Sequence, residues 1–551
     1  MTATATPPTT RAGGADGASP LAGTAALVRF GLRRDRVKLP AWTAGVGVFT
    51  LYLVGAIPAA YSQEEGDLAG AAQLFGDPVG RMLTGPAYGL DAPTYERFVA
   101  GGYGLYFLLL VALMSLLLVT RHTRAEEQTG RAELVRAGVV GRHAPLTATL
   151  VVAALTNLAA GLAVLAVMTG VGGYDPAGAG LFAVGVAVTG LAFAGVAAVT
   201  VQLSASSRAA GGLAGAVLGA AFVIRAGGDM AGEGGSALSW ASPLAWAQQT
   251  APFVLDRWWP LGLTLAFAAV AAAAGYALSS RRDLGASLLA VRAGRARAGA
   301  ALGTPLGLAL RLQRPLMLGW GAALVLMGLV YGAFTDALLA AAGDMPEAFL
   351  ELFGGAEGML AGYQAYMAVF MAFLAAGYAV MAVQGVRAEE TRGRAEAVLT
   401  TAVGRVTWLA SHLAVIAGGV VVLMVATGAA TGLGTVLVTG QGGHTVDLAL
   451  AHLGHVPAVL VVGAVAALLY GVVPRAVPAA WALVGYGLVV GTFGPLLDLP
   501  QAAFDASPFE HAAAMPQEAF AAGPVVALLG LAAALAALGA LALRRRDLEG
   551  R

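Results

Sequence analysis

The chain is 551 residues long, with 58% hydrophobic and 11% charged residues and a formal net charge of +1. Soluble domains carry about 25% charged residues, so this composition predicts a membrane protein and excludes an ordinary soluble domain. The absence of cysteine excludes disulfides, thiolate metal sites and cysteine nucleophiles.

The chain begins with a polar stretch, residues 1–20, which is rich in Thr, Ala, Gly and Pro and lacks an apolar run long enough for a signal peptide. We expect it to form a disordered cytoplasmic tail. From Leu21 to Lys38, apolar residues at helical spacing are interspersed with arginines, which predicts an amphipathic helix on the inner membrane surface. Trp42 follows at the start of the first span, where interfacial tryptophans are common.

Apolar stretches of about 18 to 25 residues, each long enough to cross a bilayer, occur twelve times along the chain. They lie near 41–60, 103–120, 147–170, 180–204, 211–228, 260–279, 315–334, 363–386, 408–430, 449–472, 477–494 and 523–543. If both termini are cytoplasmic, all Lys and Arg residues except Arg81, Arg97, Arg225 and Arg257 fall on the inner side, as the positive-inside rule requires. The sequence therefore predicts an all-α, multi-pass membrane protein with cytoplasmic termini.

Charged segments recur along the chain in register. The sequence RAEEQTGRAE at 124–133 returns as RAEETRGRAE at 387–396, and Arg-Arg-Asp-Leu at 281–284 returns at 545–548. Duplicated halves are common among transporters. We therefore expect two tandem six-span halves, 21–284 and 311–551, joined by a cytoplasmic linker at 285–310.

Motifs that the sequence lacks indicate the energy source for transport. It contains no P-loop, and its single lysine, Lys38, precedes the first span. No Asp or Glu falls in the middle of a predicted span, whereas proton-coupled transporters usually keep ionisable relays at that depth. We expect this chain to bind no cofactor itself and to depend on a separate ATPase that binds ATP and Mg²⁺.

The repeated charged segments, 121–145 and 387–406, each lie between the second and third spans of a half. We expect a turn at Gly130 or Gly393 and then a short helix that couples to the ATPase. The residues assigned to coupling are Arg124, Glu126, Glu127, Arg131 and Glu133, and Arg387, Glu389, Glu390, Arg394 and Glu396. Repeated carboxylates suit an arginine-bearing groove on a partner. The alternative is that these are solvated span ends.

Two apolar segments interrupted by proline, 238–253 and 496–516, precede the last span of each half. They are too short to cross the bilayer, so we expect re-entrant hairpins that form an outer gate, with surface loops as the alternative. Residues assigned to the gate or pathway are Arg225, Asp229, Trp240, Ser242, Pro243, Ser507 and Pro508. The spacing of Arg225 and Asp229 predicts a local ion pair, with substrate contact as the alternative.

Other polar residues in the spans have simpler roles. Asn157 is expected to bond a neighbouring helix. His412, His452 and His455 lie near span ends without cysteine or helix-spaced acidic partners, so we expect no metal site.

Motifs spread over nearly the whole chain carry a resemblance to a known family. They are the two RAEE segments, Arg225 to Asp229, Trp240 to Pro243, Asp256 to Pro260, Ser507 to His511 and both Arg-Arg-Asp-Leu ends. Together they resemble the twelve-span permeases of ABC-2 type exporters, described as actinobacterial exporters of polyketide antibiotics or tetronasin-like ionophores. The resemblance implies a plasma-membrane permease that moves hydrophobic compounds outward, works with two copies of a separate ATPase subunit, and docks coupling helices in the ATPase clefts.

Two other functions remain compatible with the sequence. A proton-coupled major-facilitator porter also has twelve spans and cytoplasmic termini, but it needs an ion relay at the membrane midplane. A membrane scaffold that recruits an ATPase without moving solute has the same composition. For the exporter, the expected partners are an ATPase homodimer, the lipid bilayer and a hydrophobic small molecule, and no nucleic acid.

Overall fold

The computed structural model describes residues 19–61, 67–289, 297–341, 355–440, 442–494 and 499–548. Within these ranges all regular secondary structure is helical. The chain divides into two compact units, Met1–Ala293 and Gly294–Arg551, and the division falls inside the expected linker. The expected tail up to residue 18, residues 290–296 of the linker and residues 496–498 of the second outer segment lie outside the described residues.

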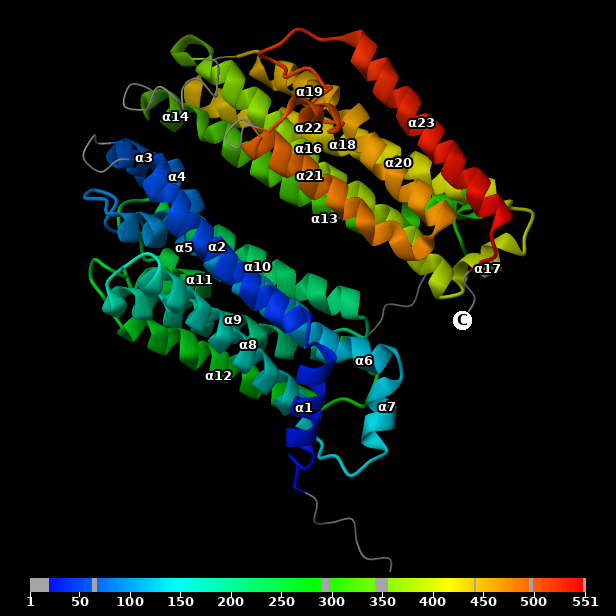
Figure 1. The fold of residues 1–551 in the computed structure, drawn as a ribbon. Coiled ribbons are helices and arrows are strands. Elements are labelled where there is room, and N and C mark those ends of the chain that lie inside the picture. The colour runs from blue at the N-terminus through cyan, green and yellow to red at the C-terminus, as the bar shows by residue number, and fades with distance from the viewer. Residues whose placement is uncertain are drawn as a thin grey trace, which may run out of the picture. The chain divides into compact units, whose positions relative to one another are not determined.

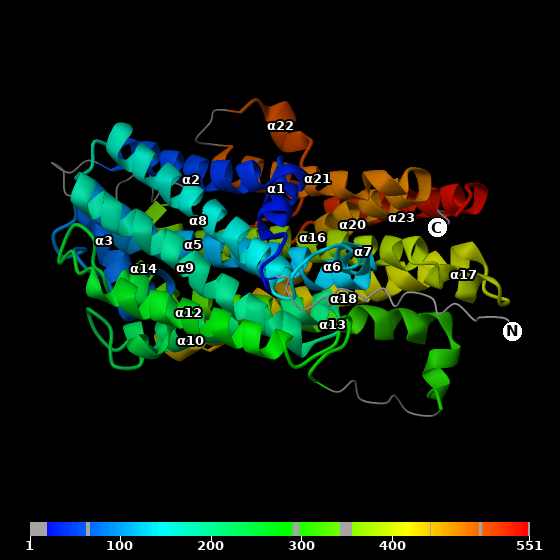
Figure 2. The ribbon, with the colours of Figure 1, turned by 90° about the horizontal axis from the view of Figure 1, so that it is seen from below.

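The first unit is a bundle of long helices, which run in one general direction in both Figure 1 and Figure 2. Its elements are α1 (Thr24–Arg34), α2 (Lys38–Ala60), α3 (Asp67–Gly76), α4 (Pro78–Thr84), α5 (Tyr95–His122), α6 (Arg124–Gln128), α7 (Arg131–Arg136), α8 (Ala144–Gly170), α9 (Pro176–Leu203), α10 (Ser207–Asp229), η1 (Ser239–Ala241), α11 (Pro243–Gln248) and α12 (Trp259–Ser279). Helix α9 is central, since it packs against α5, α8, α10 and α12.

Small residues let the helices around α9 approach closely. A Cβ added at Gly190 would lie 1.7 Å from Oδ1 of Asn157, and one at Gly195 would lie 2.9 Å from Cβ of Ala271. The Asn157 amide donates a 2.8 Å hydrogen bond to Oγ of Ser115 on α5, which confirms its predicted bond to a neighbouring helix. Close approach through small faces is the usual packing device of membrane helices.

Helix α1 confirms the predicted helix at the start of the chain and lies at a steep angle to α2 (Figure 1). Asp35, in the turn between them, fixes the bend. Its carboxylate lies 2.8 Å from Nη2 of Arg121 and 2.5 Å from Nε2 of His122, both at the end of α5. The amphipathic helix is thereby tied to the end of the predicted second span.

The second unit is built around α16, which packs against α13, α18, α20 and α21. Its elements are η2 (Ala300–Gly303), α13 (Pro305–Ala333), α14 (Thr335–Ala341), α16 (Gly355–Thr391), α17 (Arg394–Leu399), α18 (Arg405–Thr439), α19 (His444–Gly454), α20 (Val456–Val472), η4 (Pro474–Ala479), α21 (Ala480–Phe493), α22 (Gln501–Asp505) and α23 (Ala522–Arg545). The pairs α13 with α18 and α20 with α23 pack extensively. At Gly332 of α13, an added Cβ would lie 1.9 Å from the Thr431 carbonyl oxygen of α18.

Eleven helices among the described residues are long and apolar enough to cross a membrane. The predicted span at 477–494 is not among them, because its α-helix, α21, has only 14 residues. It follows the 3-10 helix η4, which contains Pro474 and Pro478. Proline lacks the N–H that an α-helix interior needs, which explains why the α-helix begins only at Ala480.

The glycine contacts give a prediction about packing. Gly332→Ala should destabilise the protein by about 2 kcal/mol, because the methyl group meets the backbone of α18 and overpacked cores cost about 1–3 kcal/mol. The matched control is Gly319→Ala in the same helix, where nothing lies within 4 Å of the added Cβ. The melting temperature of the purified protein in detergent, followed by size-exclusion chromatography, should fall by several degrees for the first variant only. Equal melting of the two variants would contradict the packing described.

Candidate functional site

Each repeated charged segment turns at a glycine and continues as a short helix. In the first unit Gly130 has φ 74° and α7 begins at Arg131; in the second, Gly393 has φ 70° and α17 begins at Arg394. Both φ values lie in the left-handed region that glycine adopts readily. The two predicted turns and short helices are therefore confirmed, while their role in coupling stays a prediction.

A partly buried ion pair joins the first short segment to the chain that follows α12. Arg282 grips Glu127 with two nitrogens, Nη2 at 2.6 Å from Oε1 and Nη1 at 2.9 Å from Oε2. The side chains of Glu127 and Arg282 are 11% and 8% exposed. Such a bidentate bond fixes both distance and orientation.

Further hydrogen bonds extend this pair into α9. Arg124, whose side chain is fully buried, bonds Oε2 of Glu127 at 2.7 Å and donates through Nε and Nη2 to the carbonyl of Val201. Arg282 also donates from Nε to Oε1 of Gln202 at 2.5 Å. The segment α6, the end of α9 and the end of α12 are thus held in one network.

The second unit repeats the arrangement. Arg546, just beyond α23, donates from Nη1 and Nη2 to the two carboxylate oxygens of Glu390, each at 2.7 Å. The Glu390 side chain is 1% exposed, and it also accepts a hydrogen bond from the hydroxyl of Tyr470 on α20. We call the pairs Glu127–Arg282 and Glu390–Arg546 the two clamps.

A second repeated arginine bonds the backbone just beyond the last long helix of each unit. Nη2 of Arg142, just before α8, donates to the Ser280 carbonyl at the end of α12 at 2.5 Å. Nη1 of Arg405, at the start of α18, donates to the Arg546 carbonyl beyond α23 at 2.5 Å. The repeated motifs of each unit therefore converge at the end of its last long helix.

The structure separates the ten residues assigned to coupling into two groups. Glu127 and Glu390 are held inside the clamps, a pairing that the sequence analysis did not predict. Of the others, Glu126 pairs with Arg34 at 2.6 Å and Glu389 with Arg394 at 2.5 Å. Arg124 begins α6 and belongs to the first network, whereas Arg387 lies within α16.

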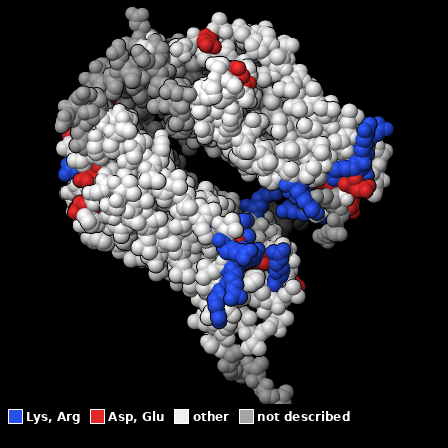
Figure 3. Space-filling model, in the orientation of Figure 1, with Lys and Arg blue, Asp and Glu red and all other residues white. Residues whose placement is uncertain are grey.

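The remaining assigned residues lie on the outer faces of the short helices. Glu133 on α7 and Glu396 on α17 are exposed. The side chains of Arg131 and Arg394 are 62% and 50% exposed. Leu134, which the sequence analysis did not single out, is 78% exposed on α7. Figure 3 shows Lys and Arg gathered, in each unit, at the end that carries its short helix.

At the other end of the first unit, Arg225 and Asp229 form the predicted ion pair. Nη1 lies 3.0 Å from Oδ2, and both side chains are fully buried. Ser239 Oγ donates to Asp229 Oδ1 at 2.5 Å, and Arg81 Nε donates to the Asp229 carbonyl at 3.0 Å. Buried charges persist only when paired and hydrogen-bonded, so this network locks α4, α10 and η1 together.

The residues assigned to an outer gate are packed within their own units. Ser242 is buried, caps α11 by accepting from the Leu244 N–H, and donates to the Ala221 carbonyl at 2.7 Å, while Pro243 occupies the first turn of α11. Trp240 stacks on Trp259 with ring centroids 5.0 Å apart.

The corresponding segment of the second unit is anchored by an aromatic contact. Ser507 and Pro508 are buried, and the next residue, Phe509, meets Phe373 with ring centroids 4.6 Å apart. Whether either segment gates a pathway stays a prediction. Among the described residues, no three His, Cys, Asp or Glu side chains gather as a metal site would require.

Comparison with known proteins links this architecture to one family. Residues 21–278 and 302–544 match the family model described as multidrug efflux system permease Rv1217c, C-terminal domain. A curated relative, the multidrug efflux system permease protein Rv1217c of Mycobacterium tuberculosis, is 39% identical over 534 residues, covering 96% of this chain and 95% of the relative. With eleven apolar helices long enough to cross a bilayer among its described residues, the chain is a multi-pass membrane protein.

The clamps give a prediction about stability. Glu390→Gln removes the carboxylate of the Glu390–Arg546 pair, and breaking a buried pair from one side costs about 3–5 kcal/mol. The double variant Glu390→Gln/Arg546→Gln should lose less stability than the sum of the two single variants, because the effects of substitutions at residues in contact are not additive. The melting temperature of the purified chain measures both effects.

The control for this experiment is Glu396→Gln, which removes an exposed carboxylate from the short helix a few residues away. It should melt like the unaltered protein. Additive losses from Glu390 and Arg546, or a loss at Glu396 as large as at Glu390, would show that the clamp does not hold this region.

Proposed function

The chain belongs to the family of multidrug efflux system permeases, and from this we propose that it is the membrane subunit of an ATP-driven, ABC-2 type exporter. A permease of this family is a drug efflux transporter rather than a catalytic enzyme. The proposed cargo is a hydrophobic, drug-like or antibiotic-like compound, moved outward across the plasma membrane.

The proposal of a separate ATPase rests on this chain's own residues. Its sequence has no P-loop, and its one lysine, Lys38, begins α2. ATP and Mg²⁺ would therefore bind to a partner. Each unit carries one short charged helix after a glycine turn, which suits two ATPase subunits, one for each unit.

The exposed faces of α7 and α17 are the proposed docking surfaces. Glu133 and Leu134 on α7 and Glu396 on α17 are accessible to a partner. A groove on the ATPase with arginines and an apolar floor would bind both the carboxylates and the leucine. Glu127 and Glu390 contribute indirectly, because each is already bonded within the chain.

The clamps are the observation that carries the coupling proposal. A force applied to α7 reaches Arg282, and hence the end of α12, through Glu127 and a bidentate bond. A force applied to α17 reaches Arg546 and α23 through Glu390. Closure of the ATPase pair on ATP binding would thus move the last long helix of each unit together with the short helix.

The proposed topology has twelve spans in two halves, with both termini in the cytoplasm. Helix α21 alone is about 21 Å long at 1.5 Å per residue, but η4 in front of it adds about 12 Å. Together they reach about 33 Å, enough for the ~30 Å of a hydrocarbon core, which supports this pair as the additional span.

The outer segments around α11 and around Ser507 are proposed to gate the exit of the pathway. In the first unit, Ser242 and the Arg225–Asp229 network tie this segment to α10 and α4. A rigidly held segment at one end of a bundle moves only when its helices move, which is the behaviour a gate needs. Substrate contact at Arg225 and Asp229 would require that network to open.

The testing experiment reconstitutes the permease with its nucleotide-binding partner in proteoliposomes and measures drug transport. ATP should drive transport, and a protonophore should leave it unchanged. Transport that collapses with the proton gradient and needs no ATPase would replace this proposal with the proton-coupled porter. If the ATPase binds but no drug is transported, the chain would be a membrane scaffold for the ATPase.

The docking surface is tested in the same system with Glu133→Arg/Glu396→Arg. This double variant should lose most co-purification of the ATPase, because it reverses an exposed charge on each short helix. The matched control is Glu233→Arg, another exposed carboxylate, in the loop after α10. Unchanged ATPase binding by the double variant would argue against docking at α7 and α17.

A further inference from the structure

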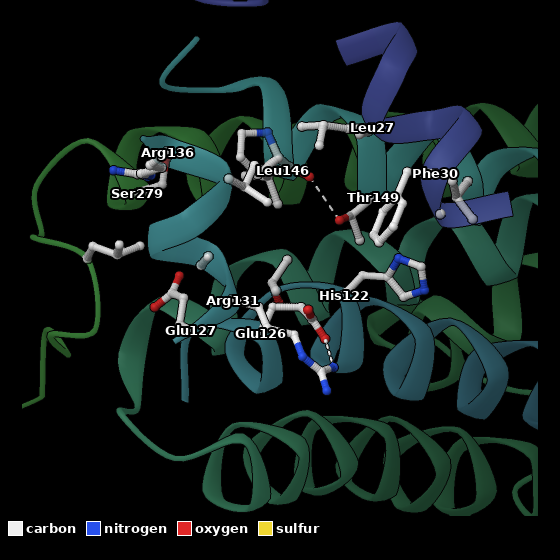
Figure 4. A pocket seen from close by; sticks show the side chains of 18 of the residues that line it. Leu27, Phe30, His122, Glu126, Glu127, Arg131, Arg136, Leu146, Thr149 and Ser279 are labelled. Carbon is white, nitrogen blue, oxygen red and sulfur yellow. Dashed lines mark hydrogen bonds and ion pairs between the residues drawn. The ribbon is translucent and has the colours of Figure 1, made fainter. Parts of the chain in front are cut away.

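The first unit contains a cleft beneath the amphipathic helix α1. It lies between α1, α7 and α8, with an empty volume of about 970 Å³, part of which is open to solvent. Figure 4 shows Leu27 and Phe30 of α1 with Leu146 of α8 along one side, and Glu126, Glu127 and Arg131 along the other. The cleft is thus apolar on one side and charged on the other.

The lining of the cleft as a whole carries excess positive charge. It includes five arginines and two glutamates, and these are Arg34, Arg131, Arg136, Arg142 and Arg282 with Glu126 and Glu127. Arg282 and Arg34 are bonded to the two carboxylates at 2.6 Å each. Arg131 lies 3.7 Å from Glu126, so the carboxylates are occupied by three of the five arginines.

Two arginines of the cleft remain available to an anion. Arg136 is exposed on α7 and makes no ion pair within the part of the chain that the structure describes. Arg142 is exposed, and among the described residues it donates only to a backbone carbonyl, that of Ser280, which does not compensate its charge. Two guanidinium groups beside one cleft favour a ligand with several acceptor oxygens, as in a phosphate group.

The apolar side is suited to a hydrocarbon chain. Leu27 and Phe30 line it from α1, Phe30 is 58% exposed, and Leu146 and Val152 line it from α8. A ligand that satisfies both sides must be an amphiphile with an anionic head. A free phosphate ion would leave the apolar side in contact with water.

The position of the cleft indicates where this amphiphile comes from. It is lined by Thr123 just after α5, Pro145 at the start of α8, Gln202 at the end of α9 and Ser279 at the end of α12. It therefore lies at the level where these apolar helices leave the hydrocarbon core. Phospholipid phosphates occupy that level, and basic pockets between membrane helices bind anionic head groups.

We propose that this cleft binds one anionic phospholipid, with its phosphate between Arg136 and Arg142 and an acyl chain along Leu27 and Phe30. Assignment to the inner leaflet rests on the proposed topology, whereas the binding site itself does not depend on the ATPase. Because Arg136 belongs to α7, a bound lipid would brace the proposed docking helix against α1. Binding of an anionic lipid would then hold the coupling segment more firmly against α1.

One site per chain is expected. In the described part of the second unit, the residues before the predicted span at 315–334 belong to the same helix as that span, because α13 runs from Pro305 to Ala333. No turn like that at Asp35 sets an amphipathic helix across the bundle there.

Native mass spectrometry of the delipidated, full-length chain in detergent tests the proposal. Dioleoylphosphatidylglycerol should bind at one saturable site, several times more tightly than dioleoylphosphatidylcholine. Arg136→Gln/Arg142→Gln should weaken this binding about 25-fold, since each arginine near anionic lipid contributes roughly a factor of five. The control Arg208→Gln/Arg281→Gln removes two exposed arginines that do not line the cleft and should bind as the unaltered chain does.

Three results would overturn the proposal. Equal affinity for the two lipids would exclude recognition of the anionic head. Unweakened phosphatidylglycerol binding by Arg136→Gln/Arg142→Gln would place the lipid elsewhere. Displacement of the lipid by millimolar inorganic phosphate would identify a free-anion site instead. None of these readouts involves ATP, so a failure here is distinguishable from a failure of the exporter proposal.

Discussion

A buried carboxylate gripped by two nitrogens of one arginine holds the charged end of each unit together. The side chains of Glu390 and Arg546 are 1% and 14% exposed, and those of Glu127 and Arg282 are 11% and 8% exposed. Buried ion pairs add little net stability because desolvation offsets their attraction, but losing one partner is costly. The clamps therefore tie the charged segment that follows α5 to the end of α12, and the charged end of α16 to the end of α23.

In each unit a third residue bonds the clamp carboxylate, and this residue differs between the units. In the first, Arg124 bonds both Glu127 and the Val201 carbonyl of α9. In the second, the hydroxyl of Tyr470 on α20 bonds Glu390 directly. The supporting group is a backbone carbonyl of α9 in the first unit and a side-chain hydroxyl of α20 in the second. The first unit also contains the cleft beneath α1, where we place a lipid.

Sequence reasoning succeeded where the physics is local. The glycine turns at Gly130 and Gly393 and the pair Arg225–Asp229 depend on residue type and spacing over a few positions, and the structure confirms them. Contacts between residues far apart in the sequence were not predicted. Nothing in the local sequence shows that Glu127 meets Arg282, and the cleft depends on the angle between α1 and the bundle. The span predicted at 477–494 has a shorter α-helix because prolines precede it, a detail that an apolar count does not register.

The most direct test of the central claim is the amount of drug transported per ATP hydrolysed in the reconstituted complex carrying Arg282→Lys and Arg546→Lys. Lysine keeps each charge but cannot make the bidentate bond. The account predicts that this variant folds, binds its ATPase and hydrolyses ATP, while transport per ATP falls severalfold because movement of the short helices no longer reaches α12 and α23. An unchanged ratio in a correctly folded complex would contradict the proposed role of the clamps.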